Sequence, residues 1–433
     1  MKLANNAAFW GRTLYLLGAP DDARPLLSLA ARYNNGSVAS ISSQARLDQL
    51  DGRYGDAAAR YLEMARHYSS EDSYRRFIEF MFAANRTEQA WAAFNQFVTQ
   101  YRGSSIWYAA GVGNRKSGMS DETLQQWLQR TVARQRILGQ ADFVLRYALR
   151  EQFIDRIPAD DFPDLMQRLS KAPDVTVHAD GSIFQGISTN GSDRRLGPSD
   201  FGFARHSRIV SADQVPSRFV LLADALGKFR QGRYALSAKA FDRLSAYYDL
   251  RGPEVGWSLP YFAIAAGMSG DAYGLEPYLA SLKDDPTYYV VLARAAFLGL
   301  GGKHSEATMM LNAAFHMWPH ADEGDTRPSY QYADTCLALF ETTHQSQYRQ
   351  LALKFARTQE YINPAESYWY ALVGYLTDDD VEKSSAVGRA LELDPRSNLV
   401  SRMPKSVQKK ARQWADTHHP FEFGEATVSD SGL

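Results

Sequence analysis

The stretch Gly52-Arg-Tyr-Gly-Asp-Ala57 decides the fold, because its glycine and alanine recur along the chain at the same spacing. Other pairs five residues apart are Gly18 and Ala23, Asn85 and Ala90, and Gly118 and Thr123. The four first members lie 34, 33 and 33 residues apart. A period of that length indicates stacked helical hairpins.

Close packing explains the pattern. The glycine supplies the left-handed conformation that ends the first helix of a hairpin. The small residue five positions later lets the second helix approach the first. One hairpin cannot bury its apolar face alone, so neighbouring hairpins supply the core.

This pattern resembles the tetratricopeptide repeat, whose 34 residues carry small residues at positions 8, 20 and 27. In a first repeat from Ala4 these positions hold Gly11, Ala23 and Ala30, and later repeats begin at Val38, Glu71 and Ser104. In the C-terminal half, Gly232, Gly270 and Gly302 anchor further units, and the unit from Tyr288 fits best. The resemblance implies an all-α fold, an α-solenoid of about ten antiparallel hairpins in a right-handed superhelix.

One region interrupts the repeats. Residues 174–217 show no helical periodicity, and Val175–Val177 with Ser182–Gln185 indicate a short β-hairpin. We therefore expect an N-terminal solenoid at 1–173, a linker or insertion at 174–217, a C-terminal solenoid with a capping helix at 218–416, and a tail at 417–433. An insertion that takes part in binding would use Arg194, Arg195, Phe201 and Phe203.

Composition excludes several classes of protein. A formal net charge of −1 gives no overall field that favours nucleic acid. No apolar run has the roughly 18–20 residues that span a bilayer, and one cysteine, Cys336, cannot form an internal disulfide. The sequence as written predicts a cytoplasmic protein, or a periplasmic one if a leader was removed. The excess of arginine over lysine is typical of a GC-rich bacterial source.

Enzyme motifs are missing from the sequence, which has no phosphate-binding loop, no Gly-x-Ser-x-Gly and no His-Glu-x-x-His. His316 and His320 have a metal-like spacing, but Pro319 interrupts their helix. Cys336 occupies a core position, so we expect a buried, inert thiol. We expect no enzyme, no metal and no cofactor.

The first helices of tetratricopeptide hairpins line a concave groove through positions 2, 5, 9 and 12. The resulting candidates for binding are Arg12, Arg46, Gln49, Arg75, Glu79, Tyr108 and Arg115. Arginine forks bind carboxylates, so this modestly basic groove favours an acidic or C-terminal peptide. The two-carboxylate clamp of some family members is absent, because Ala8 and Arg12 replace its lysine and asparagine.

The sequence thus predicts a non-catalytic scaffold that binds a protein or peptide in its groove. The oligomeric state stays open. One alternative is an extracytoplasmic scaffold in polysaccharide or envelope assembly, favoured by the 12% aromatic content. Another is an α/α-toroid enzyme acting on carbohydrate, which needs two carboxylates about 5–10 Å apart. Its candidates would be Asp180, Asp200, Glu254, Asp322 and Asp325, but no pair stands out.

Overall fold

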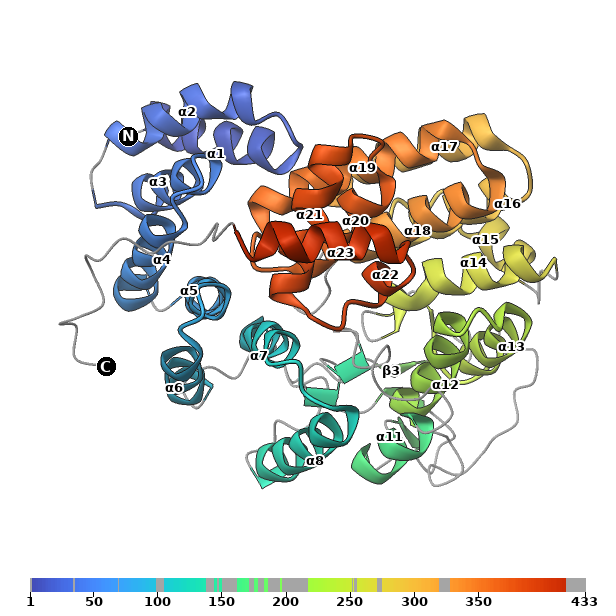
Figure 1. Cartoon of the computed structure of the whole chain (residues 1–433). Helices are drawn as coiled ribbons and strands as arrows, with labels where there is room; N and C mark the ends of the chain where they lie inside the picture. Colours follow the sequence, from blue (N-terminus) through green and yellow to red (C-terminus); the bar gives the residue numbers. More distant parts are fainter. Residues whose placement is uncertain are drawn as a thin grey trace. The chain divides into compact units, whose positions relative to one another are not determined.

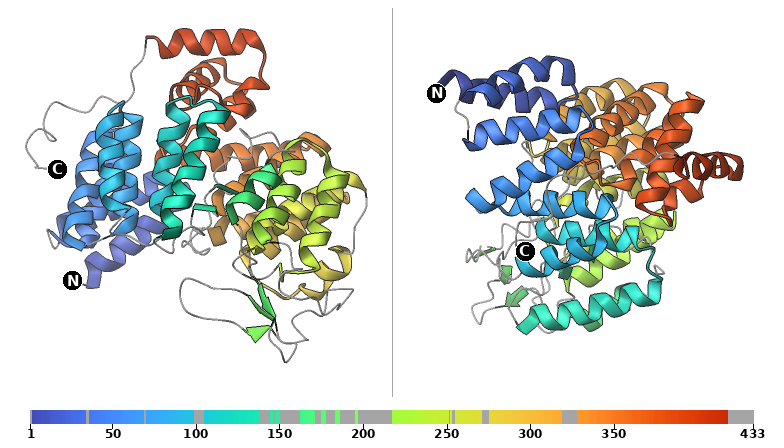
Figure 2. Two further views of the ribbon diagram at one scale, coloured as in Figure 1. Left: turned by 90° about the horizontal axis from the view of Figure 1, so that it is seen from below. Right: turned by 60° about the vertical axis from the view of Figure 1, so that its left-hand side comes forward.

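The computed structural model consists of successive helical hairpins (Figure 1). It describes residues 2–33, 36–68, 70–98, 105–137, 144–145, 148–149, 162–170, 175–177, 183–185, 195–196, 217–250, 252, 255–270, 275–318 and 328–417. The helical-repeat fold predicted from the sequence is present throughout the long described ranges. Figures 1 and 2 show α1 to α6 as antiparallel hairpins, each lying beside the one before.

The helices before the insertion are α1 (Lys2–Leu16), α2 (Pro20–Arg32), α3 (Val38–Leu50), α4 (Tyr54–Tyr68), α5 (Glu71–Ala83), α6 (Thr87–Phe97), α7 (Ser105–Lys116), α8 (Asp121–Ile137) and α11 (Phe162–Ser170). After it come α12 (Arg218–Arg230), α13 (Tyr234–Ser245), a 3-10 turn (Gly256–Ser258), α14 (Leu259–Ser269), α15 (Leu275–Ser281), α16 (Tyr288–Leu300), α17 (His304–Met317), α18 (Pro328–Thr343), α19 (Ser346–Ile362), α20 (Ser367–Leu376), α21 (Asp380–Leu393), α22 (Asn398–Ser401) and α23 (Lys405–Ala415).

The recurring glycines adopt the conformation that the sequence predicts. Gly52, between α3 and α4, has φ +72°, and the next amide, that of Arg53, donates to the Asp48 carbonyl at 2.8 Å. That bond satisfies a carbonyl left open at the end of α3. Asn85 does the same between α5 and α6 with φ 62°. The other positive-φ members of the pattern are Gly18, Gly118, Gly232, Gly270 and Gly302.

Serine side chains define where two first helices begin. Ser37 accepts a hydrogen bond from the Ser40 amide at 3.2 Å, and Ser70 accepts one from the Ser73 amide at 3.3 Å. Each satisfies one of the amides that a helix start leaves open. The small residues at positions 8, 20 and 27 are buried, as predicted: Gly11, Ala23, Ala30, Ala45, Ala57, Ala90, Ala295, Ala307 and Ala314.

Aromatic residues assigned to the core divide into two groups. Tyr61, Tyr74, Phe94, Trp107 and Phe241 are buried, and Trp127 is half-buried. The repeat pattern predicts that the aromatic residue at each of these positions, Trp10 included, lies in the core, but Trp10 is 57% exposed, so that prediction is wrong. It lies on the face of α1 that no preceding described helix covers.

Three short strands lie within the segment that interrupts the repeats. They are β1 (Val175–Val177), β2 (Ile183–Gln185) and β3 (Arg195–Leu196), in the order β1-β2-β3. Strands β1 and β2 are antiparallel, with Val175 opposite Gln185, and Phe184 of β2 lies opposite Arg195. The other candidate residues of the insertion, Arg194, Phe201 and Phe203, lie outside the described residues.

The chain divides into two compact units whose limits differ from the domains expected from the sequence. One unit combines Met1–Ser120 with Arg349–Leu433, and the other is Asp121–Tyr348. The expected boundary near residue 173 separated the chain at its break in periodicity. The first unit instead combines segments that are distant in the sequence, because α21 contacts α7 and residues 361–362 bond to α3 and α5.

Candidate functional site

The candidate site is the inner face of the first unit, which we define by Arg12, Tyr15, Arg46, Gln49, Arg76 and Arg115. These residues belong to α1, α3, α5 and α7, the first helices of the four N-terminal hairpins. Much of this face contacts residues 361–366, which end α19 and lead into α20. We call that segment the α19–α20 tip.

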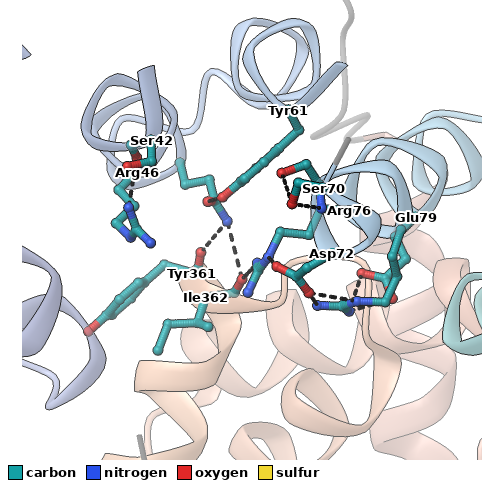
Figure 3. A network of polar contacts seen from close by, with 12 residues as sticks. Ser42, Arg46, Tyr61, Ser70, Asp72, Arg76, Glu79, Tyr361 and Ile362 are labelled. Carbon is teal, nitrogen blue, oxygen red and sulfur yellow. Dashed lines mark hydrogen bonds and ion pairs between the residues drawn. The ribbon is translucent and has the colours of Figure 1, made fainter. Parts of the chain in front are cut away.

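Gln49 makes the central contact. Its Nε2 donates to the carbonyls of Tyr361 at 3.0 Å and Ile362 at 3.2 Å (Figure 3). The Tyr61 hydroxyl donates to Gln49 Oε1 at 2.6 Å and thereby orients the amide. Both accepting carbonyls lie in the last turn of α19, where no intrahelical partner is available. The Gln49 side chain, on α3, therefore caps the C-terminus of α19.

Arg76 contributes a positive charge to the same helix end. Its Nη1 donates to the Ile362 carbonyl at 2.9 Å, and Asp72 Oδ2 accepts from its Nε at 3.2 Å (Figure 3). A cation at a helix C-terminus is favoured by the helix dipole. The guanidinium also lies 5.6 Å from the centre of the Tyr61 ring, so carboxylate and ring together fix its position.

Two tyrosines complete the cap. The Tyr15 hydroxyl donates to the Tyr361 carbonyl at 3.1 Å, and the Tyr361 hydroxyl donates to the Tyr15 carbonyl at 2.9 Å. Their rings meet edge to face with centroids 5.1 Å apart. Burial raises the pKa of Tyr361 to about 12, so this hydroxyl remains a donor at neutral pH.

The other side of the tip is held by an ion pair. Arg115 Nη2 lies 2.8 Å from Glu366 Oε2, and the two side chains are only 6% and 3% exposed. Glu366 is the residue that precedes α20, but its side chain caps no amide of that helix. Its carboxylate instead pairs with α7. The inner face thus binds the tip at the end of α19 and at the beginning of α20.

Arg12 and Arg46 form a separate, basic end of the inner face. The half-buried Arg46 donates from Nη1 to the Ser42 carbonyl at 3.0 Å and lies 6.0 Å from the centre of the Tyr15 ring. Burial lowers the pKa of Arg46, and the positive charges of Arg12 and Arg76 lower it further. Among the described residues, no carboxylate forms an ion pair with Arg46.

Two further residues of this unit have strongly shifted pKa values. Burial raises the pKa of Glu360, in the last turn of α19, to about 8, and the nearby Glu382 raises it further while Arg357 opposes the shift. Burial lowers the pKa of Lys116, at the end of α7, to about 8, although Glu392 of α21 favours its charged form. Glu360 and Lys116 therefore each lie in surroundings of low polarity.

The predicted groove residues have different environments. Gln49, Arg75, Glu79, Tyr108 and Arg115 are buried, whereas Arg12 is exposed. Arg75 pairs within its own helix, with Glu79 at 2.8 Å. These residues lie on the first helices of their hairpins, and Gln49, Arg75 and Arg115 bond to other residues of this chain.

Sequence reasoning missed Arg76 and the whole of the tip. Arg76 occupies position 6 of its repeat, one residue beyond the set that lines the groove. Glu366 lies 251 residues from Arg115, and no local pattern connects them.

The other residues considered for chemistry form no site. Cys336 is fully buried, as predicted, and burial raises the pKa of its thiol. His316 lies in α17, and His320 lies outside the described residues. In the described ranges, no cluster of three or more His, Cys, Asp and Glu side chains could hold a metal ion. The same ranges contain no helix with the length and apolarity of a membrane span.

Comparisons with known proteins give a distant likeness. No protein-family model matches the sequence, and no curated protein matches it. The chain is similar to the crystal structure of yeast Tom70, with 11% identity and a TM-score of 0.26. That alignment covers 95% of this chain and 99% of the yeast chain.

Proposed function

We propose that this chain is a non-catalytic protein-interaction scaffold, and that Arg12 and Arg46 of the inner face bind an acidic segment of a protein partner. The observation that carries the proposal is the half-buried Arg46 guanidinium, which has no carboxylate partner among the described residues. It is positioned by the Ser42 carbonyl and the Tyr15 ring.

A carboxylate is the ligand that suits this end of the inner face. Burial is the main cause of the lowered pKa of Arg46, and the positive charge of Arg12 adds to it. An incoming carboxylate would offset that charge and form charge-assisted hydrogen bonds with a guanidinium fork that is already oriented. The remainder of the inner face shows the same chemistry, because Arg115 binds Glu366 of this chain.

Affinity capture tests the proposal. The purified chain is immobilised, cell extract is passed over it, and the proteins retained at physiological salt are identified by mass spectrometry. We expect the double variant Arg12→Glu with Arg46→Glu to lose at least one protein that the wild type retains. Arg32→Glu is the control, because Arg32 is an exposed arginine at the end of α2.

The control separates a specific site from a general charge effect. Loss of the same protein with Arg32→Glu would indicate non-specific attraction to positive charge. Retention of every protein by the double variant would eliminate Arg12 and Arg46 as the binding site.

A further inference from the structure

The contact between the inner face and the α19–α20 tip is additional to the packing of the hairpins. In a helical-repeat protein each hairpin is stabilised mainly by its immediate neighbours. Here α2 packs on α3 and α4 on α5, while α20 packs on α21 and α21 on α23. Each group of helices thus has a stack of its own, and the tip bridges the two together with contacts of α7 with α21 and of Gly18 with Thr358.

The contact combines apolar groups, such as the buried Ile362 and the Tyr15–Tyr361 ring pair, with several polar bonds. The bonds of Gln49 and Arg76 to two carbonyls and the Arg115–Glu366 ion pair provide its directed interactions. Such bonds replace bonds to water, and a buried ion pair also loses its hydration, so both stabilise the closed state little. A contact of this kind can open while the apolar cores of both stacks remain intact.

The tip also has the chemistry of a ligand. It presents the open carbonyls of a helix C-terminus, and a carboxylate follows four residues after the last of them, from Ile362 to Glu366. The inner face supplies a complementary amide, guanidinium groups and a tyrosine hydroxyl.

We infer that the α19–α20 tip is an internal ligand of the inner face, and that a partner presenting a helix C-terminus followed by an acidic residue displaces it. The inference rests on the proposed function only for the existence of that partner. While the tip is bound, Gln49, Arg76 and Arg115 are occupied, so a partner's carboxylate first meets Arg46. The bound tip is therefore autoinhibitory.

Hydrogen–deuterium exchange of the full-length chain tests whether the tip opens. We expect wild-type amides of residues 360–368 to exchange faster than those of the buried helices α16 and α17. Glu366→Gln, which removes the charge that Arg115 binds, should accelerate exchange at the tip and in α5 roughly tenfold. Asp378→Asn is the matched control, since the exposed Asp378 pairs with Arg349. It should leave exchange in α5 unchanged.

A variant with the two charges exchanged keeps the inference testable if the single substitution prevents folding. If Glu366→Gln unfolds the chain, Arg115→Glu combined with Glu366→Arg restores an ion pair of reversed direction. We expect that double variant to recover protection of the tip. Tip amides that exchange only as slowly as those of α16 would overturn the inference, because the tip would then open only on global unfolding.

Capture tests the displacement itself. Glu366→Gln should retain several-fold more of the protein whose binding depends on Arg46, because its competitor is weakened. Unchanged retention despite an open tip would contradict displacement. If instead the tip opens but no captured protein depends on Arg12 and Arg46, the proposed function fails while the internal contact stands.

Discussion

Two aromatic residues at position 7 of their repeats lie in opposite surroundings. Phe77 of α5 is 1% exposed, whereas Trp10 of α1 is 57% exposed. In α5 the preceding hairpin covers this position, since α4 packs on α5. No described helix precedes α1. The burial of a side chain, and hence its contribution to stability, depends on the position of its hairpin in the stack as well as on its position in the repeat.

This difference predicts unequal effects of truncation. Phe77→Ala should lower the free energy of unfolding by about 3–5 kcal/mol, because it removes a fully buried ring and leaves a cavity. Trp10→Ala should lower it by less than about 1 kcal/mol, because most of the ring is already hydrated. Urea unfolding followed by circular dichroism measures both. Equal losses would show that Trp10 is covered in solution.

Glu360 predicts a dependence of stability on pH. Its folded pKa of about 8 lies above its unfolded value of 4.5, so the folded state binds the extra proton between these values. The free energy of unfolding should therefore fall by about 2–4 kcal/mol as pH rises from 4.5 to 8. Glu360→Gln should remove this decline, as thermal unfolding at several pH values would show.

Lys116 has the opposite effect on the pH dependence of stability, and it acts at higher pH. Its folded pKa of about 8 lies below its unfolded value of 10.5, so the unfolded state binds more protons between these values. Its contribution to the free energy of unfolding should therefore increase above pH 8.

For Glu360, the outcome that contradicts the assignment is a Glu360→Gln variant whose free energy of unfolding declines between pH 4.5 and 8 as steeply as that of the wild type.

At the scale of the element, the turn between α5 and α6 carries asparagine at the position where the repeat pattern has glycine. Asn85 occupies a left-handed position with φ 62°, where the other recurring turns carry glycine. Asparagine tolerates this conformation better than most residues, but it still retains a Cβ. The conformational strain caused by that Cβ is confined to the turn.

Substitution at this turn should therefore change stability in either direction. Asn85→Gly should raise the free energy of unfolding by up to about 1 kcal/mol, and Asn85→Ala should lower it by about 1 kcal/mol. Gly52→Ala is a useful reference, because open space surrounds Gly52 and only its φ opposes the new side chain. Differential scanning calorimetry of the three variants checks the order. A stabilising Asn85→Ala would contradict it.

The elements themselves were largely predictable from sequence. Small residues such as Ala57 and turn residues such as Gly52 act within their own repeat, so a local pattern specifies them. The candidate site was only partly predictable. Periodicity places Gln49 and Arg46 on the inner face, but their partners depend on which distant helix end meets that face. The pairing of Arg115 with Glu366 has no signature in either repeat.

At the scale of the whole molecule, the first compact unit joins the two ends of the described chain. Residues 349–417 pack with the first 120, and the division into units follows this contact. Stability within the unit should therefore be shared between segments that are distant in sequence.

A core substitution in α20 tests this sharing. Leu372 is fully buried in α20, and Leu372→Ala should cost about 2–5 kcal/mol. We expect faster hydrogen exchange in α3 and α5 as well as in α20, with little change in α12 and α13 of the second unit. Leu311→Ala, at a buried position of α17, is the control and should act mainly in the second unit. Effects confined to α20–α23 would contradict the grouping.

The ion pair between Arg115 and Glu366 has a consequence for synthesis on the ribosome. Its second member is made 251 residues after its first. At about 5–20 residues per second, roughly 12 to 50 s pass before the acid can reach the base. During that interval the nascent first hairpins present Gln49, Arg76 and Arg115 uncovered, and a nascent-chain binding factor or an early partner would encounter them before the chain's own helix end does.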